Sequence, residues 1–132
     1  MYLSRETRYA LEALMVLAER PADAFVDSRE IAAEADVPAP FLAKILRELA
    51  RGGVVNSKRG HGFALARPAN AITLGEILQA LEGPGLFDNR CIFWREECSV
   101  EEPCVLHFRW KDLKPEIESH MSRLTLAEIR PT

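Results

Sequence analysis

The chain of 132 residues lacks a long apolar segment. Its longest purely apolar run, Ala13 to Ala18, is six residues, whereas a helix that crosses a bilayer needs roughly 20. No basic stretch followed by an apolar run and a small-residue cleavage site opens the chain, so we expect a soluble cytoplasmic protein without membrane contact. Cysteine is scarce and odd in number, at three, which argues against a disulfide framework. These absences exclude a transmembrane protein and a secreted disulfide scaffold.

Catalytic signatures are also lacking. The sequence contains no nucleophile–base–acid set and no glycine-rich phosphate loop, so we do not expect an enzyme. The composition, 48% hydrophobic and 28% charged, supplies enough apolar material for a buried core. The length fits one compact domain or a small domain with an appendage.

Acidic residues are scarce in one part of the chain, although the formal net charge of the whole chain is −3. Residues 37–68 hold six cations and one anion, a local net charge of +5, and residues 69–132 hold seven cations and eleven anions. The cations of this basic stretch are Lys44, Arg47, Arg51, Lys58, Arg59 and Arg67. A local basic patch is what phosphate binding needs, because salt screens charges that lie beyond about 10 Å. The alternative is a solvated basic face without a ligand.

Three helices are predicted in the first 53 residues. Ser4 has the position of an N-cap for the first helix. Asp27 to Glu30 has the form of a capping box, whose first residue bonds forward and whose last bonds back, and it opens a second helix. A third helix follows a proline-containing turn and ends at Gly52-Gly53. The inward residues are Leu11, Leu14 and Ala18 in the first helix, Ile31, Ala32 and Ala35 in the second, and Leu42, Ile45, Leu46 and Leu49 in the third.

The period of the apolar residues changes after residue 53. Residues 54–57 and 63–66 are strand-like runs around Lys58 to Gly62, a hairpin whose two glycines permit positive φ. Thr73 to Glu76 is a second capping box, and the helix that it opens is stopped by Gly83 to Gly85. This order of elements is that of a winged helix-turn-helix. The expected fold class is mostly α with a small β wing, and the winged helix-turn-helix domain is expected over residues 1–85.

Cationic side chains coincide with the two parts of this fold that meet DNA. A recognition helix enters the major groove, and a glycine-containing wing allows the backbone to approach a phosphate or the minor groove. The candidate DNA-binding residues are Lys44, Arg47 and Arg51 on the third helix and Lys58, Arg59 and His61 at the hairpin tip. The expected partner is therefore a double-stranded DNA operator. The alternative is a small helical domain whose helix-turn-helix pattern is incidental.

The three cysteines are clustered near a histidine. Cys91, Cys98 and Cys104 are separated by six and five residues, and His107 follows after two more. Zinc sites usually pair their ligands across two to four residues, so a zinc knuckle fits poorly. Soft thiolates in a reducing compartment suit an iron–sulfur cluster, with His107 or a residue from elsewhere as the fourth ligand. Buried structural cysteines and a thiol redox switch without metal are the alternatives.

An apolar stripe follows the cysteines in the second part of the chain, residues 86–132. Its members, spaced three or four residues apart, are Leu106, Trp110, Leu113, Ile117, Met121 and Leu124. This stripe suits pairing with a partner helix in a twofold homodimer, although an intrachain core helix would show the same pattern. Pro115 interrupts it, so either the helix kinks or a second helix starts there. Thr125 to Glu128 has the sequence of a final capped turn.

Together these residues resemble the Rrf-type regulators, a bacterial family with IscR-like and NsrR-like members. The segments that carry the resemblance are Leu3 to Leu11, Val54 to Ala66, Cys104 to His107 and Leu124 to Ile129. The resemblance covers nearly the whole chain. It implies a homodimeric winged-helix transcription factor whose DNA binding responds to an iron–sulfur cluster held by the three cysteines.

The position of the histidine bears on the type of cluster. A histidine three residues past the last cysteine, His107 here, resembles the IscR-like type with a 2Fe–2S cluster. A 4Fe–4S cluster is the alternative. Two other functions stay open: a cofactor-free DNA-binding protein with a thiol switch, and a cluster-carrying electron-transfer protein.

Overall fold

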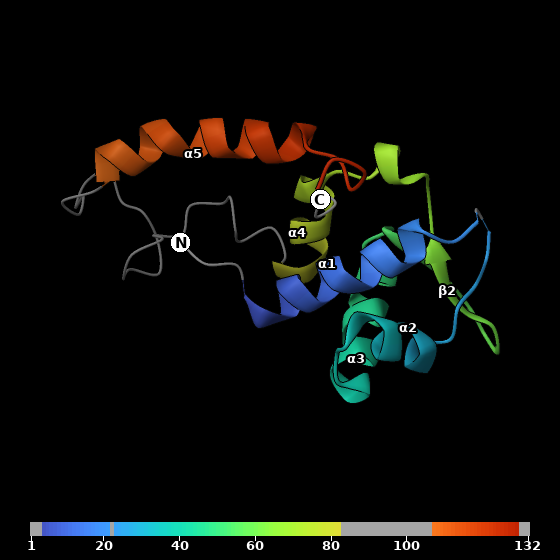
Figure 1. Ribbon diagram of the computed structural model, residues 1–132. Helices are drawn as coiled ribbons and strands as arrows, with labels where there is room; N and C mark the ends of the chain where they lie inside the picture. Colours follow the sequence, from blue (N-terminus) through green and yellow to red (C-terminus); the bar gives the residue numbers. More distant parts are fainter. Residues whose placement is uncertain (1–3, 22, 83–106, 130–132) are drawn as a thin grey trace.

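The structure is a computed structural model that describes residues 4–21, 23–82 and 107–129 (Figure 1). In chain order its elements are α1 (Arg5–Ala18), α2 (Ser28–Ala35), α3 (Ala39–Arg51), β1 (Val55–Lys58), β2 (Gly62–Leu65), the short 3-10 helix η1 (Ala69–Ala71), α4 (Leu74–Glu82) and α5 (His107–Arg123). Helices α1 to α3 pack against one another, and α4 packs between α3 and α5 (Figure 1). The predicted fold class, mostly α with a small β wing, is confirmed. None of the helices in the described ranges is both long and apolar enough to span a bilayer.

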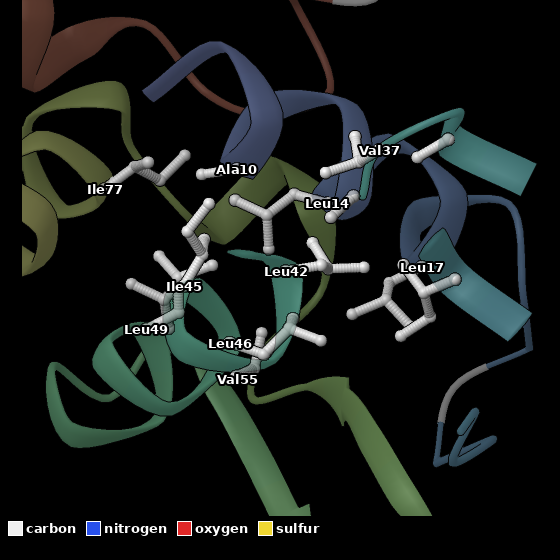
Figure 2. Close-up of a cluster of buried hydrophobic side chains, with 14 of the residues drawn as sticks. Ala10, Leu14, Leu17, Val37, Leu42, Ile45, Leu46, Leu49, Val55 and Ile77 are labelled. Carbon is white, nitrogen blue, oxygen red and sulfur yellow. The ribbon is translucent and has the colours of Figure 1, made fainter. Parts of the chain in front are cut away.

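The core lies where α1, α2 and α3 meet, and aliphatic side chains fill it (Figure 2). The residues predicted to face inward on α2 and α3 are all buried. For α1 the prediction is only partly right, because Leu14 is buried whereas Leu11 and Ala18 are half-buried. The buried side chains of α1 are Thr7, Ala10, Ala13, Leu14 and Leu17. The two small alanines let neighbouring helices approach closely, and their low hydrophobicity hid this face in the sequence.

Two of the predicted caps form. The Ser4 hydroxyl accepts a hydrogen bond from the Thr7 backbone N–H at 3.2 Å and so caps α1. The Thr73 hydroxyl accepts from the Glu76 backbone N–H at 3.2 Å at the start of α4. The Glu76 carboxylate does not complete a capping box, because it pairs with Arg67 instead. Each helix therefore begins where the sequence predicted, with one orphan N–H satisfied by a hydroxyl.

The capping box predicted for α2 is wrong in its hydrogen bonds. Asp27 is the N-cap residue, but its side chain makes no cap hydrogen bond. Its carboxylate lies 3.5 Å from Nε of Arg29, and the Glu30 carboxylate lies 3.7 Å from a guanidinium nitrogen of Arg20 at the end of α1. Cationic partners that the box pattern does not include thus compete successfully for both carboxylates.

The hairpin is tied to the segment that precedes α2. Strands β1 and β2 pair antiparallel with Val55 opposite Leu65 and Lys58 opposite Gly62, so each strand lies within one residue of its predicted position. Val26 and Phe63 exchange two backbone hydrogen bonds, at 2.8 and 2.9 Å. Gly62 has φ +103°, and a Cβ there would lie 2.0 Å from the Val26 carbonyl oxygen. Only glycine therefore fits at this position, where β2 begins directly after the turn of the wing.

The last described segment returns to the core of the first part of the chain. Helix α5 runs through Pro115 without ending, so the predicted alternative in which a second helix starts there is wrong. Beyond α5, Leu74 N–H donates to the Leu124 carbonyl and Leu126 N–H donates to the Ile72 carbonyl, both at 2.8 Å. Leu126 is fully buried among the core residues. The predicted capped turn is also present, since the Thr125 N–H donates to the Glu128 carboxylate at 2.9 Å.

Candidate nucleic-acid interface

Helix α3 separates apolar and cationic side chains onto different faces. Its apolar residues point into the core (Figure 2), whereas Lys44, Arg47 and Arg51 are exposed. In the described part of the chain, none of these three side chains forms an ion pair. The packing of α3 against α1 and α2 therefore leaves three uncompensated cations on its outer side.

The tip of the wing carries the other predicted cations. Lys58, Arg59 and His61 are all exposed. The Lys58 ammonium lies 5.8 Å from the centre of the Phe25 ring, which places it over the aromatic face. Gly60, between the two tip residues, has φ +81° and no atom near the position of a missing Cβ. Open space therefore surrounds the turn at Gly60, and the side chains of Lys58, Arg59 and His61 extend into solvent beside it.

Arg67 belongs to the basic stretch in sequence but not to this surface. Its guanidinium donates to the Ala71 carbonyl at 2.9 Å and to Glu76 at 3.2 Å, and it forms an ion pair with Glu76. The side-chain hydrogen bond with Glu76 raises the pKa of Arg67. The local charge inferred from the sequence therefore overstates what a ligand meets, because Arg67 is already neutralised within the fold.

One cation of this surface was missed in the sequence. Arg29, at the start of α2, has a side chain that is 85% exposed. It lines a hollow of about 420 Å³ between α2 and the wing, which we call the α2–wing hollow. The residues around this hollow are Asp27, Arg29, Ser57, Lys58, Arg59, Gly60, His61, Gly62 and Phe63. Arg29 was hidden inside an apparent capping box, and only the Val26–Phe63 pairing, which joins distant segments, brings it to the wing.

The α2–wing hollow has the chemistry of an anion site with one opposing group. Arg29, Lys58 and Arg59 supply three cations, and His61 adds a ring that can donate hydrogen bonds. Asp27 supplies a carboxylate that pairs with Arg29. Exposed guanidinium and ammonium groups on two converging elements suit the phosphates of a nucleic-acid backbone.

The predicted cluster ligands lie mostly outside the described residues. Cys91, Cys98, Cys104 and also Leu106 fall in the range 83–106, and His107 is the first residue of α5. Within the described residues, no group of three or more His, Cys, Asp or Glu side chains is placed to hold a metal.

The predicted dimerisation stripe lies on α5. Leu113 is 51% exposed, and Trp110, Ile117 and Met121 are half-buried. Phe108, on the same helix, is 60% exposed, and Leu124, just beyond it, is 40% exposed. Helix α5, which lies on the far side of the molecule from α3 (Figure 1), therefore carries exposed apolar side chains, Phe108 and Leu113 among them, between charged ones.

Comparison with known proteins identifies the family. The profile of the Rrf2 family, described as iron-dependent transcriptional regulators, matches residues 3–131. An HTH-type transcriptional regulator of Aquifex aeolicus is 36% identical over 133 residues, which cover 98% of this chain and 91% of that protein. The HTH-type transcriptional regulator IscR of Yersinia pestis is 30% identical over 131 residues, which cover 98% of this chain and 79% of that protein.

Solved structures agree on the fold. CymR, the global cysteine regulator of B. subtilis, superposes with a TM-score of 0.76 at 24% identity, over 98% of this chain and 95% of CymR. T. potens IscR superposes with a TM-score of 0.72 at 25% identity, over 98% of this chain and 85% of that structure. These relatives are transcriptional regulators, which confirms that the chain is not an enzyme and that it binds DNA. The chain belongs to the Rrf2 family of winged-helix transcriptional regulators.

Proposed function

We propose that this regulator binds its operator as a homodimer in the cytoplasm and that an iron–sulfur cluster controls the binding. The observation that supports the DNA-binding surface is the separation of faces on α3: Leu42, Ile45, Leu46 and Leu49 are buried in the core, and the outer side holds three cations that form no ion pair with any described residue. Helix α3 then lies in the major groove, and the wing reaches the neighbouring backbone or minor groove.

The six candidate DNA-binding residues divide into two groups in this arrangement. Lys44, Arg47 and Arg51 run along α3 and meet the phosphates that flank the major groove as well as base edges. Lys58, Arg59 and His61 lie at the wing tip, where the slender Arg59 side chain beside Gly60 suits a narrow minor groove. Arg29 adds a phosphate contact in the α2–wing hollow.

A second copy of the chain covers the apolar side of α5. Leu113, Ile117 and Met121 lie on this helix at spacings of four residues, which brings them onto one face. An equivalent helix from a partner would pack against them across a twofold axis. The two recognition helices then address the half-sites of a pseudo-palindromic operator.

The donor set that precedes and begins α5 fits an iron–sulfur cluster. Three thiolates and one imidazole are the ligand types that such clusters accept, and the family profile describes iron-dependent regulators. Cys91, Cys98, Cys104 and His107 would hold the group, and the position of His107, which resembles that in the IscR-like members, favours the 2Fe–2S type over 4Fe–4S. When bound, the cluster supplies a redox-sensitive centre whose presence depends on iron and sulfide supply. His107 is the first residue of α5. Binding of the cluster by His107 would therefore be coupled to the start of the proposed dimer helix.

The decisive experiment combines an absorption spectrum with a DNA-binding titration. Anaerobically purified protein should show charge-transfer bands in the visible and contain iron and acid-labile sulfide. Chelation of the iron should change its affinity for a duplex selected in vitro from a randomised library.

Each other outcome contradicts part of the proposal. Protein without iron, whose DNA binding responds only to thiol oxidation, would identify a cofactor-free thiol switch. Protein with a cluster but without DNA binding would identify an electron-transfer role.

Variants of the ligands sharpen the assignment. Cys104→Ser should abolish the visible bands, whereas His107→Ala should leave a labile cluster, because an imidazole is the easiest ligand to protonate and release. His107→Cys should hold a cluster with a lower reduction potential, since a thiolate adds negative charge. An unchanged spectrum and potential in His107→Ala would show that another residue is the fourth ligand.

A further inference from the structure

One large aromatic side chain is exposed at the start of the recognition helix. Phe41 lies in the first turn of α3 and is 55% exposed. The other large hydrophobic residues with high exposure among the described residues, Phe108, Leu113 and Leu124, all lie on α5 or directly after it. Those three adjoin the surface that we assign to a partner subunit. Helix α3, which carries Phe41, lies across the molecule from α5 (Figure 1), so that interface does not account for the exposure of Phe41.

The residues adjacent to Phe41 in sequence, from Val37 to Ala43, carry no polar side chain. Ala39 and Pro40 are exposed beside it, and Ala43 is half-buried. Pro40 also lacks a backbone N–H, which removes one donor from the first turn. The first side chain of α3 that can donate a hydrogen bond is Lys44, which is three residues beyond Phe41 and therefore on the same side of the helix. The leading end of α3 is thus apolar and is followed directly by cations.

This arrangement selects a particular feature of DNA. The N-terminal residues of a recognition helix approach base edges in the major groove. Hydrogen-bond donors and acceptors cover those edges except at thymine, whose C5-methyl group is the one apolar group there. A phenyl ring flanked by alanine and proline has nothing to offer guanine or adenine, but it can remove a methyl group from water. The neighbouring cations exclude an apolar protein partner as the favoured occupant, because they match the charge of a nucleic acid.

We propose that Phe41, supported by Ala39 and Ala43, reads the C5-methyl group of a thymine in each half-site of the operator. The proposal rests on the placement of α3 in the major groove described above. It adds a specificity element to that placement: the leading turn of α3 recognises thymine by apolar contact, while Lys44 and Arg47 supply affinity through charge.

The test compares thymine with deoxyuridine. Full-length protein, purified anaerobically, first selects sites from a randomised duplex library. Each thymine of the selected duplex is then replaced singly by deoxyuridine, which removes the methyl group and keeps the base pair. At one thymine in each half-site, the wild-type protein should lose about fourfold in affinity, the value expected for one buried methyl group. Phe41→Ala should bind the thymine duplex roughly tenfold more weakly and show no further loss with deoxyuridine.

Two further variants keep the test decisive. Phe41→Leu retains an apolar side chain and should retain most of the thymine preference, which guards against a fold defect in Phe41→Ala. Phe108→Ala, which truncates an equally exposed phenylalanine on α5, should leave the ratio of thymine to deoxyuridine affinities unchanged.

The outcomes separate this proposal from the one on which it rests. Failure to select any duplex would contradict the DNA-binding surface itself. Selection of a duplex in which no thymine discriminates, or an unchanged ratio in Phe41→Ala, would overturn the role of Phe41 and leave α3 in the groove.

Discussion

Helices α3 and α5 both carry an apolar stripe, but the stripe of α3 is buried within its own chain much more completely. The inward residues of α3 are fully or almost fully buried, whereas Leu113 of α5 is 51% exposed and its neighbours on the stripe are half-buried. The outer side of α3 is cationic and unpaired, while α5 keeps apolar side chains at the surface. A helix whose apolar face is satisfied offers its other face to a charged ligand, and one whose apolar face is exposed offers it to another apolar surface. In the proposed arrangement, α3 therefore contacts DNA and α5 contacts a second copy of the chain.

A leucine-to-alanine substitution in each helix should give the largest difference in the free energy of unfolding. Leu46→Ala removes a fully buried side chain from α3 and should lower the free energy of unfolding by about 2–5 kcal/mol. Leu113→Ala on α5 should change the stability of the monomer by less than about 0.5 kcal/mol. Urea denaturation, with both changes introduced into a monomeric background, measures the two values. Equal losses would show that α5 is as well packed within the chain as α3.

A charge on the α5 stripe should separate the subunits. Ile117→Glu places a carboxylate where we expect an apolar interface, which should weaken dimerisation by roughly 3 kcal/mol, or more than a hundredfold. Sedimentation equilibrium gives the association state. Glu118→Gln, a change at the adjacent position outside the stripe, is the matched control and should leave the dimer intact. A dimer that persists in Ile117→Glu would place the interface elsewhere.

The wing depends on one glycine far more than on its neighbour. Gly62→Ala creates both a positive-φ alanine and a clash with the Val26 carbonyl, so it should cost about 3 kcal/mol or detach the wing. Gly60→Ala has a similar φ but open space around it, and should cost only about 1 kcal/mol. Thermal denaturation and DNA titration of the pair separate steric clash from backbone strain. Similar losses in both variants would mean that the contact with Val26 is unimportant.

Removal of a single cation from the proposed DNA-binding surface should have a somewhat smaller effect, on operator affinity rather than on stability. Arg59→Ala should lower operator affinity by about 1–3 kcal/mol if the side chain reads base edges. Lys44→Ala should weaken binding to all sequences and reduce the salt dependence by about one unit. Arg67→Ala is the control, since its guanidinium is already paired with Glu76 and should not contribute to DNA affinity. Anisotropy titrations at several salt concentrations check all three, and a loss in Arg67→Ala would refute the assignment of its charge.

The smallest expected effect is an increase in DNA affinity. Asp27→Asn removes the carboxylate from the α2–wing hollow and should raise DNA affinity by about 0.5 kcal/mol, because phosphate no longer meets a like charge. Asparagine is as good an N-cap residue as aspartate, so the stability of α2 should not fall. Arg29→Ala should have the opposite effect on DNA affinity. A loss of affinity in Asp27→Asn would indicate that Asp27 acts mainly by holding Arg29 in place.

Features that depend on neighbours in sequence were predictable, and those that depend on distant partners were not. The apolar stripe of α3 and the hairpin with its two positive-φ glycines follow from local periodicity and turn chemistry, and the structure confirms them. The predicted capping box of α2 does not form: the Asp27 carboxylate lies near Arg29, and the Glu30 carboxylate lies 3.7 Å from Arg20, whose closer ion pair is with Glu34. Because Arg20 follows α1 and both glutamates belong to α2, no local pattern reports these pairings.

The candidate site shows the same division. The exposed positions of Lys44, Arg47 and Arg51 follow from helical spacing relative to the buried stripe. The neutralisation of Arg67 and the position of Arg29 beside the wing both require the tertiary fold. Charge counted along the sequence therefore included Arg67, which the fold pairs with Glu76, and left out Arg29, which the fold brings beside the wing.

The segment that follows α5 anchors one end of that helix to the core. Leu124 and Leu126 are hydrogen-bonded to the segment that leads into α4, and Leu126 is embedded in the core, so this end of α5 is fixed. The helix extends from there for about 24 Å at 1.5 Å per residue to its first residue, His107. The far end of α5, at His107, is thus connected to the core through this anchored end and through its packing on α4. The end of α4 near Ala80 meets Gly52 at the end of α3, where a Cβ would lie 2.5 Å from that of Ala80, so α4 is in close contact with both α5 and α3.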